Sequence, residues 1–119
     1  AGVSVLEQEK EKSVIDEATV RRAADALLQA TPAGSSIILF GSHAEGAART
    51  DSDLDFLVVE PLVRERFNEM ARLSRLLGDM LIPADVVVMS RDLFNRFRDT
   101  PNTVAYEASR KGRFYEPVA

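Results

Sequence analysis

The spacing of apolar residues along the chain divides it into helical and extended segments. Between residues 14 and 30 the apolar residues recur every three or four positions, which predicts an amphipathic helix. Its buried face is expected to contain Val20, Ala23, Ala24, Leu27 and Leu28. Three short apolar runs, at 36–40, 53–59 and 84–89, are bounded by turn-forming residues and predict buried strands.

Helical spacing returns between the second and third predicted strands and again after the third. Pro61 suits the first turn of a helix, which we expect over 62–81. The apolar positions assigned to its buried side are Val63, Phe67, Met70, Leu77 and Leu81. Ser90 is a good cap for a short helix, and the Thr-Pro pair at 100–101 is a suitable start for another. Gly112 is expected to end that last helix, and a short extended tail follows it.

This order of elements predicts an α/β fold of the α+β type, in which a small sheet is flanked by helices. With 119 residues, of which 45% are hydrophobic and 29% are charged, the chain fits one folded, soluble domain with a modest core. We expect that domain to span residues 14–119. Residues 1–13 contain the charged run EQEKEK and are predicted to form a solvated N-terminal arm.

Composition and charge narrow the classes of function. The net charge of -4 argues against a surface that binds duplex nucleic acid, which needs clustered Lys and Arg, although a local basic pocket stays compatible with it. The chain has no cysteine and therefore has no disulfide, thiolate metal site or cysteine nucleophile. Its opening residues are too charged for a signal peptide, and no apolar run reaches membrane-spanning length. We therefore expect a cytoplasmic protein without membrane contact.

Two acidic residues interrupt the second predicted strand. Because side chains alternate along a strand, Asp53 and Asp55 point to the same face, roughly 7 Å apart along the strand. Like charges at this spacing repel each other, and removing them from water is costly. A bridging cation would relieve both effects, and Mg²⁺, which prefers oxygen ligands, is the natural candidate.

A third acid, Asp85, lies near the start of the third predicted strand. If the second and third strands are parallel neighbours joined by a right-handed helical crossover, Asp85 lies beside Asp53 and Asp55. Three carboxylates at one end of a sheet can hold two metal ions, an arrangement that stabilises both the attacking and the leaving oxygen in phosphoryl transfer. The alternative is that acids at strand starts act only as caps or lie in exposed turns.

A Gly-Ser turn follows the first predicted strand. Backbone N–H groups at Gly41–Ser42 can bind phosphate if a short helical stretch begins there. The turn faces the acids only if the first two strands are antiparallel, which predicts a mixed sheet. The alternative is structural, because Ser42 and Glu45 match a capping box that satisfies the helix without any ligand.

The segment GSHAEGAARTDSDLDFLV resembles the nucleotidyltransferase motif of the DNA polymerase beta-like superfamily, in which Gly-Ser is followed by Ser-Asp-x-Asp. The short chain and the segment YEASRKGRFYE resemble the minimal nucleotidyltransferase branch of that superfamily. The resemblance implies a mixed sheet flanked by helices. It also implies Mg²⁺-dependent binding of a nucleoside triphosphate, with ATP as the default, and transfer of a nucleoside monophosphate.

The resemblance assigns a role to each residue that matches the motif. Gly41 and Ser42 would hold triphosphate oxygens, and Asp53 and Asp55 would ligate both metal ions. Asp85 would complete the metal site on the nucleophile side and help to deprotonate the acceptor hydroxyl.

Four further residues in the motif are less firmly assigned. Ser52 and Arg49 fall at positions where the family often contacts phosphate. Many members have Arg where this chain has Glu45, and a glutamate there would repel phosphate unless it points away. His43 is the only histidine, it occupies a variable position, and we expect its side chain to be solvated.

The resemblance also implies a partner. Minimal nucleotidyltransferases pair with small helical proteins of the HEPN class, often as antitoxin and toxin, so the implied reaction is AMP transfer from ATP to a tyrosine or similar hydroxyl on that partner. An alternative is a binding module that neutralises its partner by occlusion. Its contact surface could include Phe94, Phe97, Tyr106, Phe114 and Tyr115, although ordinary core packing also explains these residues. Transfer to a small molecule such as an aminoglycoside, addition to RNA and homo-oligomerisation all stay open.

Overall fold

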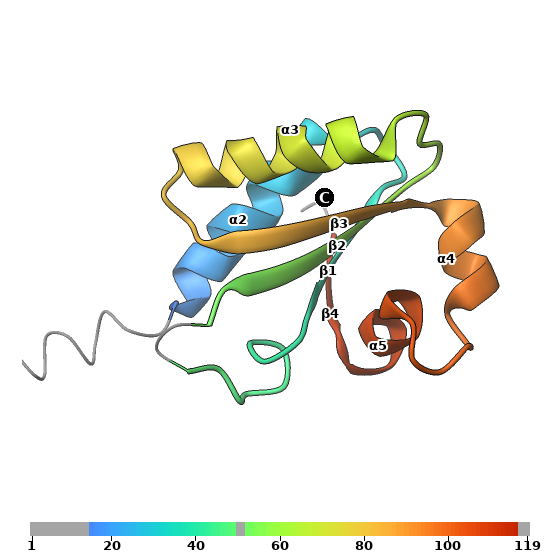
Figure 1. The fold of residues 1–119 in the computed structure, drawn as a ribbon. Coiled ribbons are helices and arrows are strands. Elements are labelled where there is room, and N and C mark those ends of the chain that lie inside the picture. Colours follow the sequence, from blue (N-terminus) through green and yellow to red (C-terminus); the bar gives the residue numbers. More distant parts are fainter. Residues whose placement is uncertain (1–14, 50–51, 117–119) are drawn as a thin grey trace, which may run out of the picture.

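The computed structural model describes residues 15–49 and 52–116. The arm expected at 1–13 lies outside the described residues. Four helices and four strands occur in the described part of the chain (Figure 1). In chain order they are α2 (Glu17–Ala30), β1 (Ser36–Phe40), β2 (Leu54–Glu60), α3 (Arg66–Asp79), β3 (Ala84–Ser90), α4 (Arg91–Phe97), α5 (Val104–Lys111) and β4 (Arg113–Tyr115).

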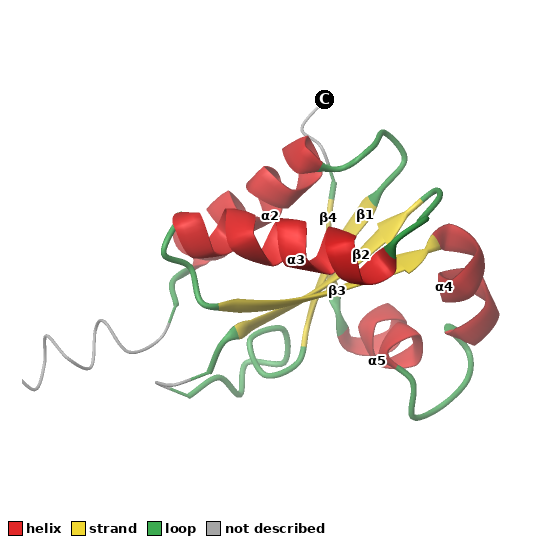
Figure 2. Cartoon of the chain, turned by 45° about the horizontal axis from the view of Figure 1, so that its top comes forward, coloured by secondary structure: helices red, strands yellow, loops and turns green. Residues whose placement is uncertain are grey.

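The strands form one mixed sheet, in the order β3-β2-β1-β4. Strand β1 is antiparallel to both β2 and β4, whereas β2 and β3 are parallel. Helices α2 and α3 cover one face of the sheet, and α4 and α5 cover the other (Figures 1 and 2). The predicted fold class and the predicted directions of the first three strands are therefore confirmed.

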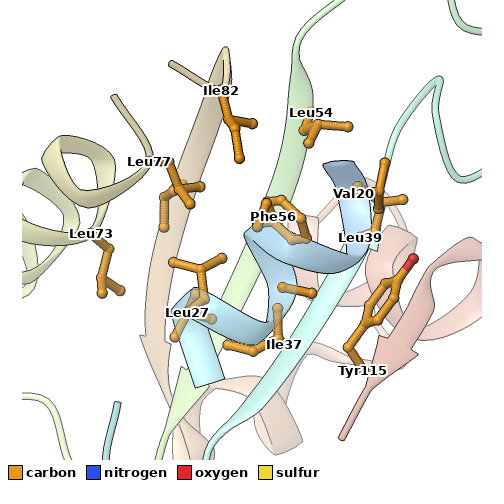
Figure 3. Packing of buried hydrophobic residues seen from close by; sticks show 14 of the residues in the cluster. Val20, Leu27, Ile37, Leu39, Leu54, Phe56, Leu73, Leu77, Ile82 and Tyr115 are labelled. Atoms are coloured by element: carbon orange, nitrogen blue, oxygen red, sulfur yellow. The ribbon is translucent and has the colours of Figure 1, made fainter. Parts of the chain in front are cut away.

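The core lies on both faces of β2. Leu54, Phe56 and Val58 point towards α2 and α3, where they meet buried side chains such as Leu27 and Leu77 (Figure 3). The intervening Leu57 and Val59 point to the other face and pack with Phe94 of α4 and Ala105 and Ala108 of α5. A strand covered on both faces carries apolar residues at successive positions, which explains the unbroken run in the sequence.

Helix α2 begins at Glu17. Asp16 is its N-cap, and the carboxylate of Asp16 accepts a hydrogen bond from the backbone N–H of Thr19 (2.8 Å). Hydrogen bonding to Thr19, first through its side chain and then through its backbone, lowers the pKa of Asp16, because it favours the charged carboxylate. The helix was predicted to begin at residue 14, but Ile15 and Asp16 precede its first turn. Val14 lies outside the described residues.

Helix α3 is shorter than the segment predicted over 62–81. The chain after Pro61 is irregular, and the helix begins only at Arg66. Its buried residues are Leu73 and Leu77, whereas the side chain of Phe67 is 75% exposed. At about 100° per residue, Phe67 lies roughly a quarter turn away from the face that Leu73 and Leu77 define, so periodicity placed it incorrectly. Leu81, also predicted to be buried, lies beyond the helix end and is 90% exposed.

Helix α5 begins three residues later than the Thr-Pro pair at 100–101 predicts. Its N-cap is Thr103, whose hydroxyl accepts a hydrogen bond from the N–H of Tyr106 (3.1 Å) and donates to Phe97 and Thr100 carbonyl oxygens. The end at Gly112 is confirmed. The extended tail that follows is β4, which pairs with β1. No helix in the described ranges is both long and apolar enough to cross a membrane.

Candidate active site

The three predicted acids meet at one end of the sheet. Asp55 of β2 and Asp85 of β3 are register partners on adjacent parallel strands. Asp53 stands just before β2, whose first residue is held by a hydrogen bond from the N–H of Leu54 to the carbonyl oxygen of Pro83 (3.0 Å). The side chains of Asp53 and Asp85 are exposed, and that of Asp55 is partly buried. The crossover through α3 thus brings together residues that are thirty positions apart in the sequence.

The negative charges act on one another. The pKa of Asp55 is raised above its ordinary value, first by burial and then by the charges of Asp85 and Asp53. A positive charge on His43 acts in the opposite direction. Because a bound cation would relieve this mutual repulsion, the electrostatics of the site favour a ligand that carries positive charge.

Gly41 is fitted directly against Asp55. It follows Phe40, the register partner of Asp55, and has a φ of 76°. A Cβ atom built on Gly41 would lie 2.5 Å from Oδ2 of Asp55, closer than non-bonded atoms can approach. The carboxylate therefore occupies the space that any side chain at this position would fill, and the Gly-Ser turn faces the acids as predicted.

The turn after Gly41 is not a helix. Two backbone hydrogen bonds close it, from Glu45 N–H to Gly41 (3.2 Å) and from Ala47 N–H to Ser42 (2.9 Å). The helical stretch predicted from Ser42 is therefore wrong. Without a helix there, Ser42 and Glu45 do not form a capping box. Oε1 of Glu45 instead lies 3.9 Å from the ammonium of Lys111 at the end of α5.

Lys111 brings a positive charge that the sequence analysis did not assign to the site. Its Nζ atom lies 3.9 Å from Glu45 and 3.7 Å from Oε2 of Glu107, so it stands between two carboxylates. Its position in the sequence, seventy residues after Gly41, gave no signal of this proximity, because the contact depends on α5 folding back beside β1.

His43 is not solvated as predicted. Its Nε2 donates a hydrogen bond to the carbonyl oxygen of Ser52 (2.9 Å), and its side chain is partly buried. Because a carbonyl can only accept, this contact assigns the ring proton to Nε2. The hydrogen bond connects the Gly-Ser turn to the residue that precedes Asp53. In the sequence, the only indication of this contact was that His43 lies between the Gly-Ser half and the Ser-Asp-x-Asp half of the motif.

Arg49 and Ser52 form a local turn. The Ser52 hydroxyl accepts a hydrogen bond from the N–H of Arg49 (2.8 Å), and the N–H of Ser52 donates to the carbonyl oxygen of Arg49 (3.1 Å). The residue Arg49 is exposed. Ser52 therefore shapes the turn before the acids, and the Arg49 side chain is exposed to solvent.

A cleft of about 370 Å³ opens beside the Gly-Ser turn. The residues that line it include Phe40, Gly41, Glu45, Thr103, Glu107 and Lys111. Because Gly41 borders both this cleft and the Asp55 carboxylate, a ligand in the cleft can extend towards the acids.

The donor set fits Mg²⁺. Within the described ranges, no three His, Cys, Asp or Glu side chains are grouped so that they could hold a metal ion by themselves. Mg²⁺ is commonly held by one or two carboxylates together with substrate phosphates and water, rather than by an all-protein cage. The carboxylates of Asp53 and Asp85, which are exposed, and of Asp55, which is partly buried, match that requirement in their chemistry.

Comparison with known families agrees with this geometry. The family model described as "Nucleotidyltransferase domain" matches residues 20–110, which is most of the chain. The chain therefore belongs to the nucleotidyltransferase domain family, within the polymerase beta-like superfamily. No curated protein matches the sequence significantly.

Several solved structures are similar to this chain, among them the following two. One is a crystal structure from Sulfolobus solfataricus, provisionally described as a nucleotidyltransferase, with 18% identity and a TM-score of 0.57 over 97% of this chain and 88% of that chain. This likeness supports the shared fold. The other is a toxin-antitoxin complex with AMP-PNP, with 19% identity and a TM-score of 0.49 over 84% of this chain and 72% of that chain.

Proposed function

We propose that this protein is a Mg²⁺-dependent nucleotidyltransferase that transfers AMP from ATP to a hydroxyl group on a partner protein. The observation that carries the proposal is the convergence of Asp55 and Asp85 across β2 and β3, with Gly41 packed against the Asp55 carboxylate. This arrangement supports the proposal, because the turn proposed to bind phosphate lies next to the carboxylates proposed to bind metal, as nucleotidyl transfer requires.

Each residue has a distinct role in the proposed reaction. Asp53 and Asp55 would hold Mg²⁺, which supplies charge neutralisation at the triphosphate when it is bound. Backbone N–H groups at Gly41 and Ser42, with the Ser42 hydroxyl, would orient the triphosphate. The acceptor oxygen forms a bond to the α-phosphorus while the bond to the β-phosphate oxygen breaks, and pyrophosphate leaves. The acceptor proton passes to the exposed carboxylate of Asp85.

Lys111 is proposed as the cation that holds the triphosphate in this chain. Glu45 stands where many relatives have Arg, and its carboxylate is directed towards Lys111. The distances of 3.7 and 3.9 Å from Lys111 to its two acidic neighbours are longer than direct hydrogen bonds, so a phosphate can compete for the ammonium. Lys111, at the end of α5, would thus take the role of the arginine that many relatives have at position 45.

The proposed acceptor is a tyrosine or similar hydroxyl on a helical partner of the HEPN class. The exposure of Asp53 and Asp85 supports a macromolecular acceptor, because a protein side chain can approach them from outside. The identity of the partner class rests on the resemblance of the motif to minimal nucleotidyltransferases.

The test uses ATP labelled at the α-phosphate, Mg²⁺ and a lysate of the source cells. We expect label on a protein with the native chain and none with Asp53→Asn, and the label should disappear on protease treatment but survive ribonuclease. Undiminished labelling by Asp53→Asn would contradict the mechanism. Label that ribonuclease removes would contradict the protein acceptor, and label found only on small molecules would favour transfer to a compound such as an aminoglycoside.

A second candidate function is neutralisation of the partner by occlusion. The observation that favours it is a set of apolar side chains beside α4, α5 and β4 that are at least one-third exposed, namely Phe97, Val104 and Phe114. Phe94 and Tyr115, considered for the same surface, are buried in the core. Occlusion predicts that an Asp53→Asn, Asp55→Asn double variant still suppresses the partner fully. Retained binding with lost suppression would exclude it.

A further inference from the structure

A second cleft lies at the opposite end of β2 from the acids. Asp55 is near the start of this strand and Glu60 is its last residue, so the two carboxyl groups are separated by roughly 17 Å of strand. The connection from β2 to α3 lies at the opposite end of the sheet from the β1–β2 loop (Figure 1). The cleft has a volume of about 470 Å³, and its lining includes Glu60, Leu62, Val63, Arg64, Glu69 and Arg72.

Glu60 is the buried polar residue of this cleft. Its side chain is only 4% exposed, and among the described residues its Oε2 atom has no hydrogen-bond partner. Ser35 lies one position beyond the paired Ser36 and Val59, next to Glu60, and its Oγ atom is also buried without a partner there. The Ser35 hydroxyl can donate as well as accept, whereas an ionised Glu60 carboxylate can only accept, so its buried Oε2 atom without a donor is costly.

Two arginines near Glu60 are engaged by other groups. Arg72 binds the Glu69 carboxylate in a bidentate pair at 2.7 and 2.8 Å, and also donates to the carbonyl oxygen of Ala30. Arg91 is directed to Ser36 and the Gly34 carbonyl oxygen. Arg64 is exposed and, among the described residues, is the lining cation that does not belong to the Glu69 pair. Glu60 is therefore a carboxyl group whose charge lacks a direct counter-ion among these neighbours.

We propose that this cleft is a second binding site, in which Glu60 receives the ammonium or guanidinium group of an organic cation. Such a group brings several N–H donors to the Glu60 carboxyl group, which lines the cleft. Leu62 and Val63 provide apolar wall for the carbon chain of the ligand. An anionic ligand is disfavoured, because it would meet Glu60 and Glu69 together. The proposal is independent of nucleotidyl transfer.

Binding at this site competes with a proton. Burial raises the pKa of Glu60 to about 7, and the hydrogen bond that its protonated form makes to Glu69 adds to the effect. Hydrogen bonding to Arg72, and then to Glu60, lowers the pKa of Glu69 to about 2. Arg64 and Glu65 of the connecting segment also face the cleft. A cation must displace the proton from Glu60, so affinity should rise with pH up to about 7 and fall about tenfold for each pH unit below it.

The experiment titrates the full chain with n-butylammonium and ethylguanidinium, and with 1-butanol as the neutral match. Amide shifts in NMR spectra report the binding and its location. We expect saturable shifts around Glu60 with either cation at about pH 8 and affinity about a hundredfold weaker at about pH 5. Proton release, measured calorimetrically in two buffers, should accompany binding at about pH 7. Absence of saturable shifts, or binding without proton release, would overturn the proposal.

Matched variants locate the site. Glu60→Gln keeps the shape but removes the charge, and it should weaken cation binding at least tenfold, whereas Glu65→Gln at the exposed rim should leave it nearly unchanged. Equal binding by Glu60→Gln and the native chain would refute the role of Glu60. If Glu60→Gln does not fold, proton release by the native chain on cation binding still tests whether a carboxyl group that titrates near pH 7 binds the cation. Asp53→Asn should bind the cations normally, which separates this site from the active site.

Two probes distinguish the source of the cation. Spermidine represents a free polyamine, and the blocked tripeptide Leu-Arg-Leu represents an arginine side chain of a partner protein, with Leu-Ala-Leu as its control. Tighter binding of the arginine peptide would assign the site to a protein partner, and tighter binding of spermidine would assign it to a free amine. Failure of both to displace bound n-butylammonium would overturn the proposal.

Discussion

At the scale of single residues, the position of the Asp55 carboxylate depends on the absence of a side chain at Gly41 and on the backbone conformation there. A Cβ at Gly41 would collide with the Asp55 carboxylate, and the φ of 76° is also unfavourable for any other residue. Gly46 offers a matched comparison, because its φ is 73° but a Cβ there meets no atom within 4 Å among the described residues.

We predict that Gly41→Ala and Gly46→Ala lose similar stability, about 1–2 kcal/mol each from the left-handed backbone. Only Gly41→Ala should also lose about 100-fold in transfer rate, because it displaces the Asp55 carboxylate. Urea unfolding and the α-phosphate labelling assay measure the two effects. Equal activity of the two variants would show that the contact has no role in the site.

Lys111→Ala should raise the KM for ATP about tenfold and leave kcat nearly unchanged, because the lost contact binds the triphosphate in the ground and transition states alike. Arg110→Ala is the control, since Arg110 pairs with Asp99 and not with the cleft residues. Initial rates at varied ATP concentration decide the question. A fall in kcat with unchanged KM would instead assign Lys111 to the chemical step.

The stability of the native chain and of Asp55→Asn can report metal binding without an activity assay. Because its pKa is raised on folding, its ionised form opposes folding above the ordinary aspartate range. Asp55→Asn should therefore melt at a higher temperature than the native chain in EDTA at neutral pH. Mg²⁺ at a hundredfold excess over its Kd should stabilise the native chain by about 2.7 kcal/mol and Asp55→Asn far less. Equal stabilisation of both chains would place the ion elsewhere.

At the scale of elements, the strands were more predictable than the helices. Each core strand is buried on both faces over most of its length and therefore carries a largely apolar run, interrupted in β2 and β3 only by the site acids, and each predicted range matches the observed bounds within a residue. Helix α3 was misjudged because its apolar positions exceed what one face can bury, and only contact with the sheet selects Leu73 and Leu77 over Phe67. The start of α5 was misjudged because two threonines could act as N-cap, and Thr103 has the tertiary support.

The junction between α5 and β4 depends on a close approach at Gly112. A Cβ there would overlap the Ala108 carbonyl oxygen and lie 2.5 Å from Cγ2 of Ile38. Gly112→Ala should therefore cost about 1–3 kcal/mol through overpacking. Gly78→Ala is the control, because a Cβ at Gly78 in helix α3 meets nothing within 4 Å in the described part of the chain and should stabilise by about 0.5–1 kcal/mol. Urea unfolding measures both, and a neutral Gly112→Ala would contradict this packing.

At the scale of the whole molecule, the order and directions of the strands bring the residues of the site together. The motif could be recognised in the sequence because its residues lie close together between Gly41 and Asp55. The approach of Asp85 required the parallel pairing of β2 and β3, which a helical crossover allowed us to predict. Lys111 could not be predicted, since its contact depends on where α5 packs, and neither could Glu60, which in sequence is only the polar end of a strand.

The pH dependence of stability should reflect the buried carboxyl of Glu60. Its pKa is raised to about 7 from 4.5, so the folded chain holds a proton that the unfolded chain has released, and stability falls as pH rises between these values. We expect a loss of roughly 1–2 kcal/mol between about pH 5.5 and pH 8. The low pKa of Glu69, about 2, does not contribute in this window. Urea unfolding should show a flatter profile for Glu60→Gln, and an equally steep one would exclude Glu60 as the cause.

The place of β4 in the sheet has a consequence for synthesis. Strand β1 lies between β2 and β4, yet β4 follows every other described element in the chain. While the chain emerges from the ribosome, β1 can pair with β2 but keeps one open edge until Arg113–Tyr115 is made. An open strand edge invites pairing with other chains, so the nascent protein passes through a stage in which neighbouring copies compete with its own last strand.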